Sequence, residues 1–172
     1  MNSRWAVICG IAITVLLSAP AHAWDATGHQ VVARIAWDQM QPEPRQAAIA
    51  LLRATPEDAG LRNLVPEGVS SLADRERVFF EKASTWADIV RDPRSAERRA
   101  KYHDSPWHYI NYFWEQSGPN AKPKDREDLK PERENVVERL EHFQVSVADK
   151  TRDRGLRAID LAWVLHIVCD ST

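Results

Sequence analysis

Cysteine is scarce in this sequence of 172 residues, and an excess of basic residues is missing altogether. Beyond the N-terminal apolar run, Cys169 is the only cysteine. Cys169 is expected to be either a small buried apolar residue or a residue whose partner lies outside this chain.

The charge balance also limits the function. The 23 basic and 25 acidic residues argue against a protein held on nucleic acid by bulk charge. The composition does not exclude an enzyme that relies on bound metal ions for positive charge.

A long hydrophobic run is present, but it is too short for a membrane anchor. The run from Trp5 to Leu17 is followed by Pro20, whereas a spanning helix needs roughly 20 apolar residues. Arg4 precedes the run, and the triplet Ala21-His22-Ala23 ends the segment with small residues. This order is typical of a secretory signal peptide. We therefore predict that residues 1–23 are removed after Ala23 and that the protein is exported to a periplasm or the cell exterior.

The predicted mature chain is long enough for one domain. Removing 23 of the 172 residues leaves 149, which can bury a sizeable core. Arg4 is the only charged residue removed, so the net charge of the mature chain is −3. We predict a single domain over residues 24–172. Because the apolar pattern runs into Thr172 without a cap or polar tail, we expect this domain to be incomplete at its C-terminus.

Apolar residues recur at helical spacing through most of the mature chain, which predicts an all-α fold without convincing strands. Residues 54–71 and 115–131 have the composition of loops. Five helices are expected: from Thr27 to the break at Gln41-Pro42, from that break to Leu52, from Asp74 to Val90, from Pro131-Glu132 to about Asp149, and from Arg154 to about Asp170.

Two pairs of polar side chains share faces of predicted helices. His166 and Asp170 are four residues apart, and zinc binds both His nitrogen and Asp oxygen. They also suit a core histidine and a carboxylate at a helix end. Asp88 and Arg91 are three residues apart and suit either a surface ion pair or a binding site.

Two further motifs contain a histidine. His108 lies in the aromatic run from Trp107 to Tyr112, where it either packs or binds a ligand. Trp24 is the first residue after the predicted cleavage point, and His29 lies further along the same motif. A freed α-amino group has a pKa of roughly 7.7–8.0, so it can lose its proton to a metal. The Trp24 amine, the Trp24 carbonyl and the His29 imidazole could form part of a coordination sphere.

Together and in this order, the four motifs resemble the secreted zinc-dependent single-strand nucleases of the S1/P1 type, in the phospholipase C/nuclease superfamily. The resemblance covers Trp24 to Thr172. It rests on Trp-x-x-x-Gly-His, Ala-Ser-x-Trp-Ala-Asp, Trp-His-Tyr-Ile-Asn and Leu-His-x-x-x-Asp. It implies an endonuclease and 3′-nucleotidase that hydrolyses single-stranded DNA and RNA to 5′-phosphorylated products. It implies no stable protein partner and, after signal cleavage, no membrane.

The resemblance also implies roles for individual residues. Asp88, Arg91 and Asp170 would be catalytic. Arg91 would hold phosphate, Tyr109 would stack on a base, and Asn111 would lie near the base edge. The ligands of one zinc would be Asp88, His108, His166 and Asp170, and those of a second would be the Trp24 amine and carbonyl, His29 and the bridging Asp170.

Three departures from the family pattern concern the C-terminal end of the sequence. Cys169 stands where the family usually has Gly, and Thr172 where it often has His. The later Gln-Pro-Leu-His and His-x-x-x-Asp segments, which supply a third zinc, are missing from this sequence. Three alternatives stay open: a phospholipase C of the same superfamily, a non-catalytic helical module that binds metal or nucleic acid, and a signal-anchored structural protein.

Overall fold

The computed structural model describes residues 25–170, so the predicted signal peptide, Trp24 and Thr172 lie outside the described residues. The predicted all-α class is confirmed. Within the described residues, a pair of two-residue strands and four short 3-10 helices join the α-helices. The 3-10 helices are η1 (Glu57–Ala59), η2 (Leu61–Leu64), η3 (Pro93–Ser95) and η4 (Ser105–His108). The α-helices are α2 (Ala26–Gln39), α3 (Pro42–Leu52), α4 (Leu72–Ala83), α5 (Trp86–Val90), α6 (Ala96–Tyr102), α7 (Val136–Ala148) and α8 (Arg154–Asp170).

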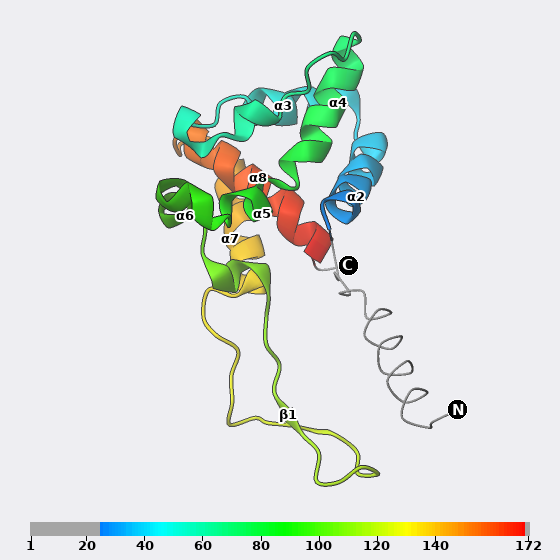
Figure 1. The fold of residues 1–172 in the computed structure, drawn as a ribbon, viewed down its shortest axis with the longest axis vertical. Coiled ribbons are helices and arrows are strands. Elements are labelled where there is room, and N and C mark those ends of the chain that lie inside the picture. The colour runs from blue at the N-terminus through cyan, green and yellow to red at the C-terminus, as the bar shows by residue number, and fades with distance from the viewer. Residues whose placement is uncertain (1–24, 171–172) are drawn as a thin grey trace, which may run out of the picture.

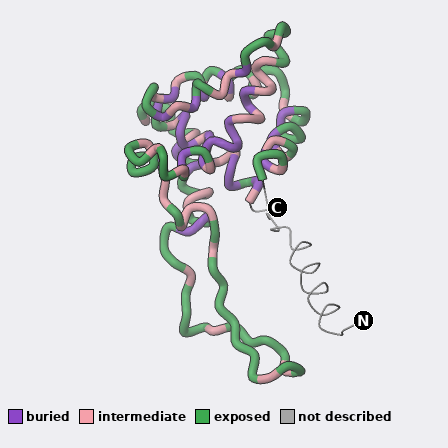
Figure 2. The backbone as a smooth tube through the Cα atoms, viewed as in Figure 1, coloured by how far each residue is buried: buried purple, intermediate pink, exposed green. Residues whose placement is uncertain are grey.

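Helix α8 forms the centre of the fold and packs against α2, α3, α4, α5 and α7 (Figure 1). Trp163 on α8 is fully buried. Its ring centroid lies 5.1 Å from that of Trp107 and 6.0 Å from that of Phe143. Large aromatic rings bury the most apolar area per residue, so this cluster contributes strongly to the core. The buried segments accordingly gather around α8 in Figure 2.

Side-chain caps fix the beginnings of the helices that carry the candidate site. The Asp25 carboxylate accepts hydrogen bonds from the backbone N–H groups of Thr27 and Gly28, so α2 begins just before His29. The Asp153 carboxylate accepts from Leu156 N at 2.9 Å and starts α8 at the predicted place. Such caps stabilise a helix by about 1 kcal/mol each.

The single helix predicted from Asp74 to Val90 is wrong, because α4 ends at Ala83 and α5 begins at Trp86. The hydroxyls of Ser84 and Thr85 donate to the carbonyls of Glu81 and Lys82. Ser and Thr side chains compete with helical backbone bonds in this way. The break leaves the Ser84 carbonyl free to accept a hydrogen bond from another element.

The structure differs from the prediction at two further places, an additional helix and the start of α7. Helix α6 was not expected, although it follows the break at Asp92-Pro93. Helix α7 begins at Val136 rather than near Glu132, because Glu134 has a φ of 61° and interrupts the helical backbone. Asn135 then caps α7 by accepting from the N–H groups of Val137 and Glu138. Near the start of α7, the side chain of Val137 is exposed.

The segment between η4 (Ser105–His108) and α7 projects from the helical body as a long arm (Figure 1). Figure 2 shows that most of the arm is exposed. Residues Trp114–Glu115 (β1) pair antiparallel with Lys124–Asp125 (β2), and this short pair is compatible with the predicted all-α class. Tyr112 and Trp114 are exposed along the arm.

Candidate metal centre

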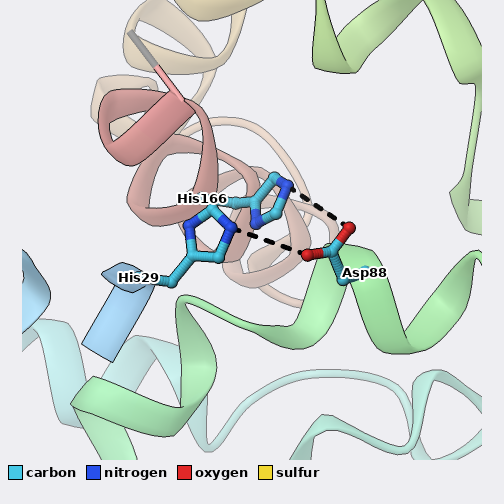
Figure 3. A group of neighbouring side chains, drawn as sticks. All are labelled: His29, Asp88 and His166. Atoms are coloured by element: carbon cyan, nitrogen blue, oxygen red, sulfur yellow. Dashed lines mark ion pairs between the residues drawn. The ribbon is translucent and has the colours of Figure 1, made fainter. Parts of the chain in front are cut away.

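Five candidate ligand side chains, drawn from all four sequence motifs, come together at one place. His29 lies on α2, Asp88 on α5, His108 at the end of η4, and His166 and Asp170 on α8. Figure 3 shows how His29, Asp88 and His166 point toward one another. Residues up to 141 positions apart in sequence thus contribute to one cluster, because α8 contacts both α2 and α5.

The first group of donors consists of His29, Asp88 and His166. His29 Nε2 lies 3.5 Å from one Asp88 carboxylate oxygen, and His166 Nε2 lies 4.0 Å from the other. The two imidazoles are stacked, with centroids 4.3 Å apart. The side chains of His29 and His166 are 1% exposed, whereas that of Asp88 is 34% exposed. Solvent therefore reaches the group from the Asp88 side.

The second group shares His166 with the first. His166 Nε2 lies 3.0 Å from His108 Nδ1 and 3.2 Å from Asp170 Oδ2. His108 Nδ1 lies 3.9 Å from the same Asp170 oxygen. The other Asp170 oxygen lies 3.6 Å from His29 Nε2. Asp170 therefore connects the two groups with its two oxygens.

These distances fit metal coordination. Donor atoms bound tetrahedrally to one zinc at its usual bond lengths lie about 3.3–3.6 Å apart. The donor pairs here are separated by 3.0 to 4.0 Å, close to that spacing. Imidazole nitrogens and carboxylate oxygens are also the donors that zinc takes in catalytic sites. By distance and by chemistry, the residues present fit a divalent transition metal.

The break between α4 and α5 fixes the orientation of His166. The Ser84 carbonyl accepts a hydrogen bond from His166 Nδ1 at 2.9 Å. The proton of the neutral imidazole then lies on Nδ1, and Nε2 presents its lone pair to the cluster. A backbone carbonyl that orients a metal-binding histidine in this way is a common feature of metal sites.

Sequence reasoning missed His103, which follows α6. His103 Nδ1 lies 3.3 Å from His108 Nε2, the nitrogen that points away from the cluster. Burial lowers the pKa of His103 below its usual range. The only signal in the sequence was its spacing of five residues from His108, and the helix that places it was not predicted.

The pKa values of Asp88 and His108 suit metal binding near neutral pH. A hydrogen bond from His29, aided by the charges of His166 and Arg91, lowers the pKa of Asp88 to about 2. Burial, with a smaller effect of His166, lowers the pKa of His108 to about 4. An ionised carboxylate and a neutral imidazole are the forms that bind metal, so neither Asp88 nor His108 has to release a proton at neutral pH in order to bind one.

The predicted substrate-binding residues lie at the edge of the cluster or beyond it. Arg91 Nη1 lies 3.6 Å from Asp88 Oδ1, and the Arg91 side chain is 56% exposed. Tyr109 is exposed, and its carbonyl accepts from Val136 N, which holds the backbone beside His108. Asn111 is exposed, and its side chain makes no hydrogen bond within residues 25–170.

Cys169 is a buried thiol next to the cluster. Its Sγ lies 3.1 Å from the Leu165 carbonyl and 3.6 Å from the His29 carbonyl. Burial raises its pKa to about 11, so the thiol keeps its proton at neutral pH. The burial of Cys169 fits the small buried residue that the sequence allowed.

Among the helices of residues 25–170, none has the length and apolar character needed to cross a membrane. The structural role of Trp24 lies outside the described residues, as do the predicted signal peptide and Thr172.

Residues 24–172 match a protein-family model described as S1/P1 Nuclease. Comparison with curated proteins found no match, and neither did comparison with solved structures. The family match covers every described residue and all five side chains of the cluster. The chain therefore belongs to the S1/P1 nuclease family, whose members are hydrolases of phosphodiester bonds.

Proposed function

We propose that this protein is an exported, zinc-dependent nuclease and 3′-nucleotidase that cuts single-stranded DNA and RNA to 5′-phosphorylated products. One observation carries the proposal. His29, Asp88, His108, His166 and Asp170 converge with donor spacings suited to zinc, in a chain of the S1/P1 nuclease family. The family match favours a nuclease over the alternative of a phospholipase C of the same superfamily.

The proposed ligands divide between two zinc ions. Asp88, His108 and His166 would hold the first, and His29 would hold the second with the Trp24 amine and carbonyl. Asp170 would bridge the two, which is supported by its two oxygens lying 3.2 Å from His166 and 3.6 Å from His29. The family's third zinc has no assigned ligands in this sequence.

The residues of the chain would divide the chemistry among them. Divalent ions held by these residues would supply charge that lowers the pKa of a water molecule and neutralises phosphoryl oxygens. Asp88 and Asp170 would hold that charge in place as carboxylates. Arg91, exposed beside Asp88, would donate hydrogen bonds to the phosphate and share the charge that builds on its oxygens during in-line attack.

Tyr109 would give the protein its preference for single-stranded over duplex nucleic acid. Tyr109 directly follows the proposed ligand His108 in the sequence, and its side chain is exposed. Stacking on an unpaired base contributes roughly 1–3 kcal/mol and tolerates any base. A base in a duplex presents no free face, so stacking favours single strands. Asn111 would contact the edge of the stacked base.

Export would also complete the site. Until Ala23 is removed, the Trp24 nitrogen is an amide and a poor metal ligand. Signal cleavage would convert it into an amine that binds metal after losing one proton. The protein would therefore stay inactive until it has left the compartment in which it is made.

A hydrolysis assay tests the proposal. The purified protein, with Trp24 as its first residue, is incubated with single-stranded and duplex oligonucleotides of one sequence. We expect 5′-phosphorylated products from the single strand, loss of activity on chelation and recovery with zinc. Stoichiometric zinc binding without turnover would instead support a non-catalytic module. Turnover that survives chelation would overturn the proposal.

A further inference from the structure

The two nitrogens of His108 face different surroundings. Nδ1 faces His166 and Asp170 in the cluster, at 3.0 and 3.9 Å. Nε2 faces the opposite way and lies 3.3 Å from Nδ1 of His103. The His108 side chain is 8% exposed, so its Nε2 depends on a protein partner rather than on bulk water.

We infer that His103 is a positioning residue that accepts a hydrogen bond from His108 Nε2–H and so directs the His108 Nδ1 lone pair toward the metal centre. The inference rests on the proposed metal-binding function. A neutral imidazole that binds metal through Nδ1 carries its proton on Nε2. That buried N–H needs an acceptor, and His103 Nδ1 is at hydrogen-bond distance.

The surroundings of His103 support a role beyond packing. Its ring is stacked on Trp163, with centroids 6.4 Å apart and planes inclined by 22°. Its other nitrogen, Nε2, is buried and has no hydrogen-bond partner among residues 25–170. A buried polar atom without a partner costs about 1–3 kcal/mol. An apolar ring would fill this place without that cost, so packing alone does not account for a histidine here.

His103 and Ser84 would perform the same task from two sides. The Ser84 carbonyl fixes the proton of His166 on Nδ1 and leaves Nε2 for the metal. His103 would fix the proton of His108 on Nε2 and leave Nδ1 for the metal. The two neighbouring ligands would then present lone pairs to one point. Loss of such an orienting partner typically weakens metal affinity 10–100-fold.

Three variants separate positioning from packing. His103→Phe keeps an aromatic ring against Trp163 but removes the acceptor. His103→Asn removes the ring but keeps an acceptor near the place of Nδ1. His142→Phe, at an exposed position of α7, is the matched control for the substitution itself. Zinc affinity is measured by competition with a chromophoric chelator, and the stability of the metal-free protein by urea unfolding.

We expect His103→Phe to bind zinc 10–100-fold more weakly than wild type while its metal-free stability is unchanged or higher. We expect His103→Asn to recover most of the affinity, and His142→Phe to match wild type. Wild-type affinity in His103→Phe would overturn the inference while leaving the proposed function intact. A wild-type protein that binds no zinc would overturn the proposed function and this inference with it.

Discussion

Asp170 Oδ2 lies 3.2 Å from His166 Nε2, one helical turn away on α8. The same spacing is common on solvated helix faces, where it forms a weak ion pair. Here His166 is buried and Asp170 also reaches His29 with its other oxygen, at 3.6 Å. One carboxylate thus contacts imidazoles from both donor groups, which supports its proposed role as a bridging ligand.

Asp170→Asn tests that role. We expect the variant to lose zinc from both proposed sites and hydrolysis to fall ~100-fold or more, since a neutral amide replaces the shared negative ligand. Zinc per chain is measured by mass spectrometry of the native protein, and turnover on a single-stranded oligonucleotide. Asp125→Asn, exposed on β2, is the matched control and keeps both zinc and turnover. Full activity in Asp170→Asn would contradict the bridging role.

Arg91 is expected to act on substrate rather than on the metal. Arg91→Ala removes a donor to the phosphate, so kcat/KM falls by about 100-fold while zinc content stays at the wild-type level. Arg94→Ala is a suitable control because Arg94 is 90% exposed and is paired with Asp92. If zinc content falls together with activity in Arg91→Ala, Arg91 instead supports the ligand Asp88.

The metal-free protein should lose stability in mildly acidic solution because of His108. Its pKa is lowered from 6.5 to about 4 in the folded state, so the unfolded chain takes up a proton first as the pH falls. The stabilisation is complete above pH 6.5 and is lost as the pH falls toward 4, which amounts to about 3 kcal/mol. Urea unfolding across this range measures it. His108→Asn is expected to flatten the profile, and an unchanged slope in that variant would contradict the assignment.

The mature N-terminus gives a separate test of the second zinc. One additional residue before Trp24 turns its amine into an amide, which binds metal poorly. We expect one zinc per chain fewer, with the sites of Asp88, His108 and His166 still filled. Removal of the added residue by a specific protease is the control and restores the lost zinc. Unchanged zinc content in the extended protein would exclude the Trp24 amine as a ligand.

The sequence allowed the helical class, the extent of α8 and all five members of the cluster to be predicted. The spacing of His166 and Asp170 survives folding because both lie on one continuous helix with a capped start. Recognition of Asp88 and His108 depended on the order of the motifs, since each alone also suited packing or a surface pair.

Features that depend on contacts between distant segments were not predictable. The helix break at Ser84 interrupts an apolar pattern that is otherwise helical. Its structural role depends on the hydrogen bond that the Ser84 carbonyl accepts from His166 on α8. His103 acquires its contact with His108 through α6, a short helix whose polar sequence gives no apolar periodicity. The arm contains a strand pair of two residues on each side, which is too short for an alternating pattern.

Anomalous diffraction at the zinc absorption edge tests the central claim most directly. In crystals of the protein beginning at Trp24, we predict two anomalous peaks about 3.5–4 Å apart. One is expected at about 2.0–2.2 Å from His108 Nδ1, His166 Nε2, Asp88 and Asp170, and the other at the same distance from His29 and Asp170. Zinc bound elsewhere on the chain, with these five side chains free of anomalous density, would contradict the account.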